Sequence, residues 1–245
     1  MTQLSDAVLE VGPDAEALAQ RAADWLVGLT GGRGDRITVA LSGGATPRRL
    51  YELLAEPPRR DRMPWERIHW FWGDERFVLP DHPDSNYRMV REAMLSRVAI
   101  PDGNFHPVPT VGLDPEEAAR AYERELQAVH GSDRLDPARP LFDVTLLGLG
   151  SDGHTASLFP GTAALEERRR WVVAVIGAKP EPRISLTFPA LDSSANLAFL
   201  VAGEGKRAAL ARVLAGDRTL PAARVRPVGQ LWFFLDRAAA PDQQQ

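Results

Sequence analysis

The sequence predicts an α/β fold in which helices cover both faces of a doubly wound, mainly parallel sheet. Along the 245 residues, continuous apolar segments alternate with segments whose apolar residues recur every three or four positions, which is typical of strands followed by helices. Several apolar segments end in glycines, where the chain can turn sharply into the next element. No linker divides the chain, so we expect one Rossmann-like domain over residues 1–245, with a frayed tail at 238–245.

The first third of the chain predicts a helix, a strand and a second helix. Residues 14–29 form a helix whose inner face carries Leu18, Ala22, Trp25, Leu26 and Leu29. Residues 36–44 (RITVALSGG) form a buried strand that ends in glycines. Residues 46–56 form a helix, because Thr46 can cap it and Pro47 suits its first position.

The remaining elements continue the alternation. Residues 67–76 (RIHWFWGDER) are rich in β-branched and aromatic residues, which favours a strand that stops at Gly73. Residues 84–98 form a helix that Ser85 can cap. A helix and a buried strand are expected at 115–129 and 141–150. In the last part of the chain, four extended segments are expected at 170–178, 183–191, 195–203 and 230–236. One more helix is expected at 205–216.

Composition and charge narrow the class of protein. The formal net charge of −4 gives no electrostatic attraction for nucleic acid, so an anionic ligand needs a local positive pocket. The chain has no cysteine, and its five histidines lack metal-binding spacing, so we expect neither a disulfide nor a metal site. No apolar run approaches the roughly 20 residues that span a bilayer, and the first residues do not resemble a signal peptide. We therefore expect a cytoplasmic protein that does not contact a membrane.

Three predicted strands end in chemically unusual sequences: LSGGATP, WGDER and GLGSDGHTASLFPG. In doubly wound sheets, ligands bind beyond the carboxyl ends of the strands. If the three strands open on the same edge of the sheet, their ends meet in one crevice.

The first of these sequences, LSGGATPRR, is compatible with a phosphate cradle. Gly43 and Gly44 let a ligand approach the backbone, and the free N–H groups and positive dipole end of the following helix favour an anion. The hydroxyls of Ser42 and Thr46 add donors, whereas the G-K-[ST] of a triphosphate loop is missing. The alternative is a plain turn capped by Thr46, and spacing alone does not decide between the two.

The second sequence continues as GDERFVLPDHPDSN and contains the carboxylates Asp74, Glu75, Asp81 and Asp84. A solvated acidic loop is the simpler interpretation. The position of Asp74 and Arg76 at the end of a strand makes these two residues candidates for the crevice.

The third sequence spaces its glycines as G-x-G-x-x-G, followed at once by His154. A dinucleotide-binding turn would also need a carboxylate at the end of the next strand, which here ends in GAK. A structural histidine remains an alternative, but an imidazole on a glycine turn, with Asp152 two residues earlier, favours a catalytic base because histidine titrates near neutral pH.

Lysine is rare in this chain. Only Lys179 and Lys206 are lysines among 29 basic residues, a bias that genomic base composition explains. Ammonium and guanidinium differ in size and hydrogen-bond geometry, so a lysine in a glycine-bounded turn can have a role that arginine would not fill.

Together the three motifs resemble the family of 6-phosphogluconolactonases and glucosamine-6-phosphate deaminases, over about residues 41–206. Later matches are RISLT and GEGK. The resemblance implies hydrolysis of 6-phospho-D-glucono-1,5-lactone to 6-phosphogluconate, in the oxidative pentose phosphate pathway, with no metal or organic cofactor. The implied partner is a small sugar phosphate.

One position separates the two activities of this family. The deaminase pattern resembles D-G-H-x-A-F-N-E-P-G, with a glutamate that assists ring opening, whereas this chain has DGHTASLFPG with Phe159 in that place. An apolar ring cannot move protons, so the lactonase activity is favoured over the deaminase.

The resemblance also implies roles for individual residues. His154 removes a proton from the attacking water, and Asp152 orients the ring or stabilises the imidazolium. Either N–H groups of the glycine turn or Arg76 stabilise the oxyanion. The expected substrate-binding residues are Ser42, Gly43, Gly44, Thr46, Asp74, Arg76, Arg183 and Lys206, of which Ser42, Gly43, Gly44, Arg183 and Lys206 are expected near the 6-phosphate.

Two other functions stay open at this point. Related folds serve as sugar-phosphate sensors in transcription regulators, but no basic helix-turn-helix pattern stands outside the α/β body. An oxidoreductase that binds NAD(P) is weakened by the missing carboxylate. The sequence does not fix the oligomeric state, with which a monomer is compatible.

Overall fold

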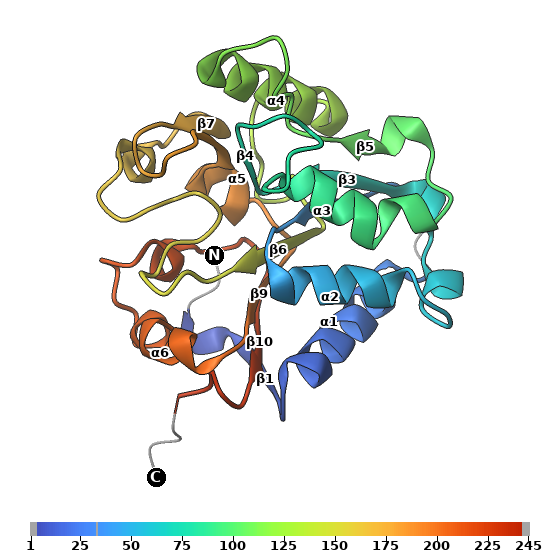
Figure 1. The fold of residues 1–245 in the computed structure, drawn as a ribbon, viewed down its shortest axis with the longest axis vertical. Coiled ribbons are helices and arrows are strands. Elements are labelled where there is room, and N and C mark those ends of the chain that lie inside the picture. Colours follow the sequence, from blue (N-terminus) through green and yellow to red (C-terminus); the bar gives the residue numbers. More distant parts are fainter. Residues whose placement is uncertain (1–3, 33, 242–245) are drawn as a thin grey trace.

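The computed structural model describes residues 4–32 and 34–241. Its centre is a seven-stranded sheet, parallel throughout, in the order β1-β10-β9-β6-β2-β3-β5 (Figure 1). The strands are β1 (Val8–Gly12), β2 (Ile37–Leu41), β3 (Ile68–Trp72), β5 (Phe105–His106), β6 (Val144–Gly148), β9 (Asn196–Val201) and β10 (Gln230–Asp236). The predicted mainly parallel sheet is therefore confirmed, and the sequence analysis missed β1 and β5, which form its two edges.

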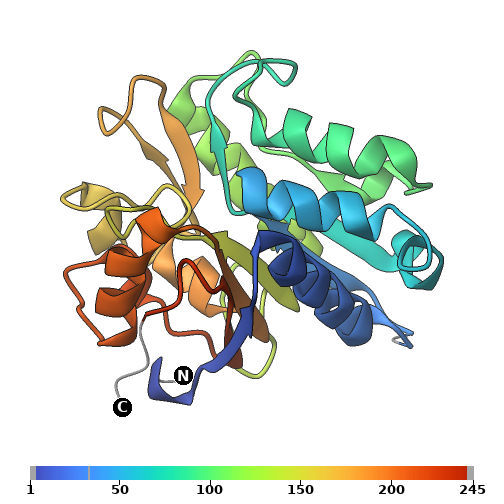
Figure 2. The same cartoon turned by 60° about the horizontal axis from the view of Figure 1, so that its bottom comes forward.

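Helices cover both faces of this sheet, as predicted. Helices α1, α2 and α3 lie on one face, and α5 and α6 lie on the other (Figures 1 and 2). Helix α4 packs against a smaller sheet. The helix bounds are α1 (Ala15–Thr30), α2 (Ala45–Leu54), α3 (Asn86–Ala93), α4 (Pro115–His130), α5 (Phe188–Asp192) and α6 (Arg207–Leu214). Within the described residues, no helix combines the length and the apolar character that a membrane crossing requires.

The smaller sheet is antiparallel and contains parts of three segments that the sequence analysis expected to be extended, at 67–76, 170–178 and 183–191. The last of these is a strand only as far as Leu186, because Phe188–Asp192 forms α5. The strands of this sheet are β4 (Asp74–Arg76), β8 (Arg183–Leu186) and β7 (Val172–Val175), in the order β4-β8-β7. The strand expected over 67–76 stops at Gly73, as predicted, and the chain continues as β4; the Gly73 carbonyl accepts the N–H of Leu186 at 2.9 Å. The chain thereby leaves the main sheet and carries Asp74 and Arg76 with it.

Caps are confirmed in one helix and corrected in another. The hydroxyl of Ser85 accepts the N–H of Arg88 at 3.1 Å and caps α3, as predicted. Thr46 does not cap α2, because that helix already begins at Ala45. Its N-cap is Gly44, which has φ 109°. The Thr46 hydroxyl is therefore free of the capping role.

The expected frayed tail at 238–245 is wrong for its first part. Ala239 is buried, and its N–H donates to Asp236 Oδ1 at 2.7 Å. Residues 242–245 lie outside the described part of the chain.

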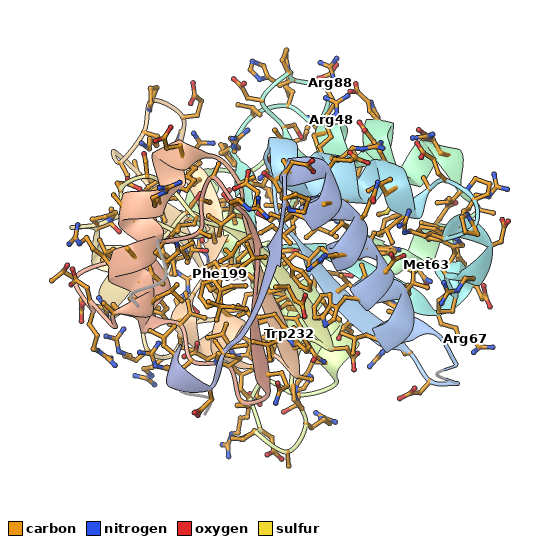
Figure 3. All side chains as sticks on the ribbon, turned by 90° about the horizontal axis from the view of Figure 1, so that it is seen from below. Arg48, Met63, Arg67, Arg88, Phe199 and Trp232 are labelled. Carbon is orange, nitrogen blue, oxygen red and sulfur yellow. The ribbon has the colours of Figure 1, made fainter. Side chains whose placement is uncertain are left out.

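The core of the molecule lies between the main sheet and its helices. Phe199 of β9 stacks on Phe233 of β10 with ring centroids 4.9 Å apart, and both are fully buried. Figure 3 shows Phe199 in the interior, whereas Arg48, Arg67 and Arg88 lie at the periphery. The loops that carry the candidate site residues extend from the edge of this buried sheet.

The strand order defines where a ligand can bind. From β2 the chain proceeds to β3 and β5 on one side, and from β6 it proceeds to β9 and β10 on the other. The neighbours β2 and β6 therefore flank the point at which the winding direction reverses. In folds of this type the ligand crevice lies there, beyond the carboxyl ends of the two strands.

Candidate active site

A pocket of about 410 Å³ lies at this switch point. Its walls come from the start of α2, from the turn after β6, from β4 and from the loop after β9. Most of the predicted site residues meet here, namely Ser42, Gly43, Gly44, Thr46, Asp74, Arg76, His154 and Lys206. Two predicted residues, Asp152 and Arg183, do not line the pocket.

The turn after β6 is built around His154. The N–H of Gly150 donates to the His154 carbonyl at 2.8 Å, and the Thr155 hydroxyl donates to the Gly148 carbonyl at 2.9 Å. A Cβ at position 150 would come within 2.0 Å of His154 Nδ1, so glycine is required for the ring to pack against the turn. No α-helix follows this turn, and the next helical residues are a short 3-10 segment at Ala163–Glu166. The glycine spacing therefore shapes a histidine turn and lacks the helix N-terminus that holds a dinucleotide.

Asp152 holds the His154 ring in one orientation. Its Oδ1 lies 2.5 Å from His154 Nδ1 and accepts the backbone N–H of His154 at 3.1 Å. Burial opposes ionisation of this carboxyl, but the hydrogen bonds from the ring and backbone of His154 outweigh it and lower the pKa of Asp152. An ionised carboxylate only accepts hydrogen bonds, so Nδ1 carries the shared hydrogen and Nε2 of the neutral ring is unprotonated.

Phe159 forms an apolar contact with this histidine. The centroid of its ring lies 4.7 Å from the centroid of the His154 ring, and the Phe159 side chain is buried. The ammonium of Lys179 lies over the same ring, 5.0 Å from its centre. Lys179 itself is exposed and does not line the pocket.

The start of α2 presents backbone donors to the pocket. The first N–H groups of a helix have no partner within it, and the first bond of α2 runs from the N–H of Arg48 to the carbonyl of Gly44. Pro47 has no N–H, so Ala45 and Thr46 supply the available donors, and both line the pocket. No side chain caps this end. The phosphate cradle inferred from LSGGATP is geometrically feasible.

The acidic sequence after β3 divides into structural and pocket residues. Glu75 is buried and accepts the N–H groups of Asn86 and Tyr87, each at 2.7 Å, so it anchors the start of α3. Burial raises the pKa of Glu75 despite these bonds. Asp74 lines the pocket, and its Oδ2 accepts the Ser157 hydroxyl at 2.7 Å. Asp81 and Asp84 are exposed, so the solvated-loop interpretation is correct for them alone.

Two arginines lie side by side at the second sheet. Arg76 and Arg183 are directly paired between β4 and β8, and only Arg76 lines the pocket. Arg76 donates to the carbonyl of Asp84. The buried Nε of Arg183 has no hydrogen-bond partner among the described residues, and its guanidinium lies 3.7 Å from Glu181. The expected contact of Arg183 with the phosphate stays a prediction.

Among the pocket residues that sequence reasoning did not predict are Asn86 and Ala156. Asn86 is buried, lines the pocket and donates from Nδ2 to the Asp74 carbonyl at 2.9 Å; its amide fills the space that a Cβ at position 43 would need. The motif DSN, which contributes to the family resemblance, contains Asn86, but the sequence analysis did not include this residue among the expected site residues. Ala156 also lines the pocket, with φ 47°. No residue type marks such a backbone position in advance.

Comparison with known proteins identifies the family of the chain. A family model described as glucosamine-6-phosphate isomerases/6-phosphogluconolactonase matches residues 13–233. The chain is 44% identical over 240 residues to the 6-phosphogluconolactonase of a Nostoc species, a match that covers 96% of this chain and 97% of that protein. The crystal structure of the 6-phosphogluconolactonase of Thermotoga maritima superposes with a TM-score of 0.79 at 35% identity, covering 94% of this chain and 100% of that chain.

The fold alone does not separate the two activities within this group. A monomeric glucosamine-6-phosphate deaminase superposes with a TM-score of 0.78 over 95% of this chain and 98% of that chain, but at 20% identity. That likeness shows a shared fold and no more, whereas the family model spans most of the chain. The chain belongs to the glucosamine-6-phosphate isomerase/6-phosphogluconolactonase family.

Proposed function

We propose that this protein hydrolyses 6-phospho-D-glucono-1,5-lactone to 6-phospho-D-gluconate. The observation that carries the proposal is the His154 imidazole, fixed by Asp152 at 2.5 Å, in a pocket that also contains a helix N-terminus and Lys206. The pocket thus combines an imidazole held in one orientation with groups that bind an anion. Such a combination suits a phosphorylated substrate that reacts with water.

His154 acts as a general base in this proposal. Its Nε2 takes a proton from a water molecule while the water oxygen attacks C1 of the lactone. The bond between C1 and the ring oxygen then breaks, and the imidazolium returns the proton to that oxygen, which becomes the C5 hydroxyl. The negative charge of Asp152 stabilises the imidazolium between the two steps.

Arg76 is the proposed donor for the oxyanion that forms at C1. The N–H groups of Gly150 and Gly153 are already used inside the turn, by the carbonyls of His154 at 2.8 Å and of Gly150 at 3.0 Å. Arg76 lines the pocket and retains donors beyond the one that it gives to Asp84. A guanidinium in this position stabilises developing negative charge.

Lys206 and the start of α2 are the proposed phosphate site. Helix N-termini bind phosphate through free N–H groups and the positive end of the helix dipole, here the N–H groups of Ala45 and Thr46. Lys206 adds a full positive charge to the same pocket. The protein as a whole has a net charge of −4, so this local positive charge is what attracts the anionic substrate.

Phe159 supports a lactonase in preference to a deaminase. The position next to the base holds a buried aromatic ring, which offers no proton to a ring oxygen. Lactone hydrolysis requires no acid there, because the ring opens when the tetrahedral intermediate collapses.

A cytoplasmic location, a monomeric state and the absence of any cofactor stay predictions.

The test is an assay with freshly generated 6-phosphogluconolactone. Formation of 6-phosphogluconate is followed with an excess of a dehydrogenase that oxidises it, and the rate of spontaneous hydrolysis is subtracted. We expect protein-dependent hydrolysis that persists after treatment with a chelator. A rate equal to the protein-free control would refute the proposed function, and loss on chelation with recovery on adding a divalent ion would refute the metal-free mechanism.

A further inference from the structure

Lys206 lines the pocket from the end of a short 3-10 helix, directly before α6, and the chain reaches it through the turn that follows β9. Strand β9 ends at Val201, and the short 3-10 helix η7 (Glu204–Lys206) begins three residues later. Between them Gly203 has φ 93° and ψ 146°, a conformation that is open to glycine and unfavourable for other residues. The N–H of Lys206 donates to the Gly203 carbonyl at 3.0 Å. The position of Lys206 therefore depends on what fixes Gly203.

A buried carboxylate on the neighbouring strand fixes this glycine. Asp236 is the last residue of β10 and is only 5% exposed. The pairing of Leu235 with Val201 sets it beside the start of the loop. Both carboxylate oxygens accept the N–H of Gly203, each at 3.0 Å.

The chain after β10 strengthens the same connection. Asp236 Oδ1 also accepts the N–H of Ala239 at 2.7 Å, which folds the C-terminal turn back over the carboxylate. Arg207, next to Lys206, donates from Nε to the carbonyl of Ala238 at 3.1 Å. The lysine loop is thus tied to the end of β10 on both sides of Lys206. This is the region that the sequence analysis expected to be frayed.

We propose that Asp236 is a positioning residue that fixes Gly203 and thereby places the ammonium of Lys206 in the pocket. The inference rests on the proposed function, in which Lys206 binds the substrate phosphate. Asp236 does not line the pocket, so its effect on the substrate passes through Lys206. A carboxylate suits this role because it offers two acceptors to converging N–H groups, whereas an amide offers one acceptor and one donor.

The experiment compares Asp236→Asn, Lys206→Ala and the double variant. Isothermal titration calorimetry measures the Kd of 6-phosphogluconate, and kinetics compare 6-phosphogluconolactone with unphosphorylated gluconolactone. We expect Asp236→Asn to raise the Kd of 6-phosphogluconate at least about 3-fold, within the range for residues that share one hydrogen-bond network. The kcat/KM for gluconolactone should stay within about 1.5-fold, because that substrate has no phosphate for Lys206 to contact.

The double variant separates positioning through Lys206 from a general structural role. If Asp236 acts through Lys206, Asp236→Asn adds less than about 1.5-fold to the Kd once Lys206 is alanine. Additive effects, or equal losses on the two lactones, would overturn the inference. So would an unchanged Kd in a folded Asp236→Asn protein.

A matched control and a second variant complete the design. Asp192 is partly buried and also accepts a backbone N–H, from Arg226 at 2.6 Å, but it lies at the end of α5 and does not line the pocket, so Asp192→Asn should leave the Kd unchanged. If Asp236→Asn does not fold, Gly203→Ala perturbs the same loop and should give the same phosphate-dependent loss. An unchanged Kd in folded Gly203→Ala would then overturn the inference.

The outcomes also distinguish this inference from the proposed function. Loss of phosphate binding in Lys206→Ala with no effect of Asp236→Asn refutes the positioning role alone. Absence of lactone hydrolysis by the unaltered protein refutes the proposed function, while the Kd of 6-phosphogluconate still tests Asp236. No effect of Lys206→Ala on that Kd refutes both the phosphate assignment and the positioning role.

Discussion

Asp152→Asn is the substitution that tests most sharply how the histidine is held. Oδ1 of Asp152 accepts both the ring Nδ1–H and the backbone N–H of His154, at 2.5 Å and 3.1 Å. Two donors converge on one oxygen, so in the variant the amide oxygen takes that place and the amide nitrogen points away. The tautomer with an unprotonated Nε2 is retained, and only the negative charge is lost.

The expected loss follows from the difference between charged and neutral hydrogen bonds. A bond to a charged group contributes about 1.5–3 kcal/mol and a neutral bond about 0.5–1.5, so the imidazolium loses about 1–1.5 kcal/mol of stabilisation. The Asp152 side chain is 47% exposed, so solvent screening excludes a larger electrostatic effect. At about 1.36 kcal/mol per factor of ten, kcat should fall about 5- to 13-fold.

Steady-state kinetics on 6-phosphogluconolactone measure this effect, with spontaneous hydrolysis subtracted. The KM should not change, because Asp152 does not line the pocket. Asp81→Asn, which neutralises an exposed carboxylate outside the pocket, is the control and should leave both constants unchanged. An unchanged kcat in Asp152→Asn would refute the stabilising role of the charge. A loss of more than about a thousandfold would show that the tautomer is not retained.

Three further predictions concern the phosphate, the alternative reaction and stability. Lys206→Ala should lower kcat/KM for 6-phosphogluconolactone by a factor that corresponds to a loss of about 1.5–3 kcal/mol, the range of a charged hydrogen bond, and should barely affect unphosphorylated gluconolactone. Lys206→Arg should recover part of this loss. Equal losses on both substrates would contradict the phosphate contact. Phe159 beside the base predicts no ammonia release from glucosamine 6-phosphate, and release above the protein-free control would favour a deaminase. Burial raises the pKa of Asp192 to about 7 against the hydrogen bond from Arg226, so the folded state holds this proton more tightly than the unfolded chain. The free energy of unfolding should therefore fall as pH rises from about 4 to about 7, and Asp192→Asn should remove that part of the fall, as denaturation at a series of pH values would show.

The sequence was informative where a residue's role follows from its own strand. LSGG and GLGSDGH end β2 and β6, and the reversal of winding between these two strands brings both motifs to one pocket. The prediction that Ser85 caps α3 is confirmed, and it was possible because capping depends on residues only a few positions apart. For the same reason the interpretation of His154 with Asp152 needed no knowledge of the rest of the fold.

Roles that depend on distant contacts were not predictable. The segments over 170–178 and 183–191 read as strands, but nothing in them indicates that β7 and β8 pair with β4 and not with the main sheet. That pairing sets Arg183 beside Arg76, outside the pocket lining. The contribution of Asp236 likewise arises from its register with β9.

The direct test of the account is the turnover of His154→Ala beside the unaltered protein, in the corrected assay with 6-phosphogluconolactone. Circular dichroism first establishes that the variant is folded. A positioned proton acceptor contributes about 10²- to 10⁴-fold, so the account predicts a loss of that size in kcat. A folded variant with near-normal turnover would contradict the central claim that the histidine at the switch point is the base.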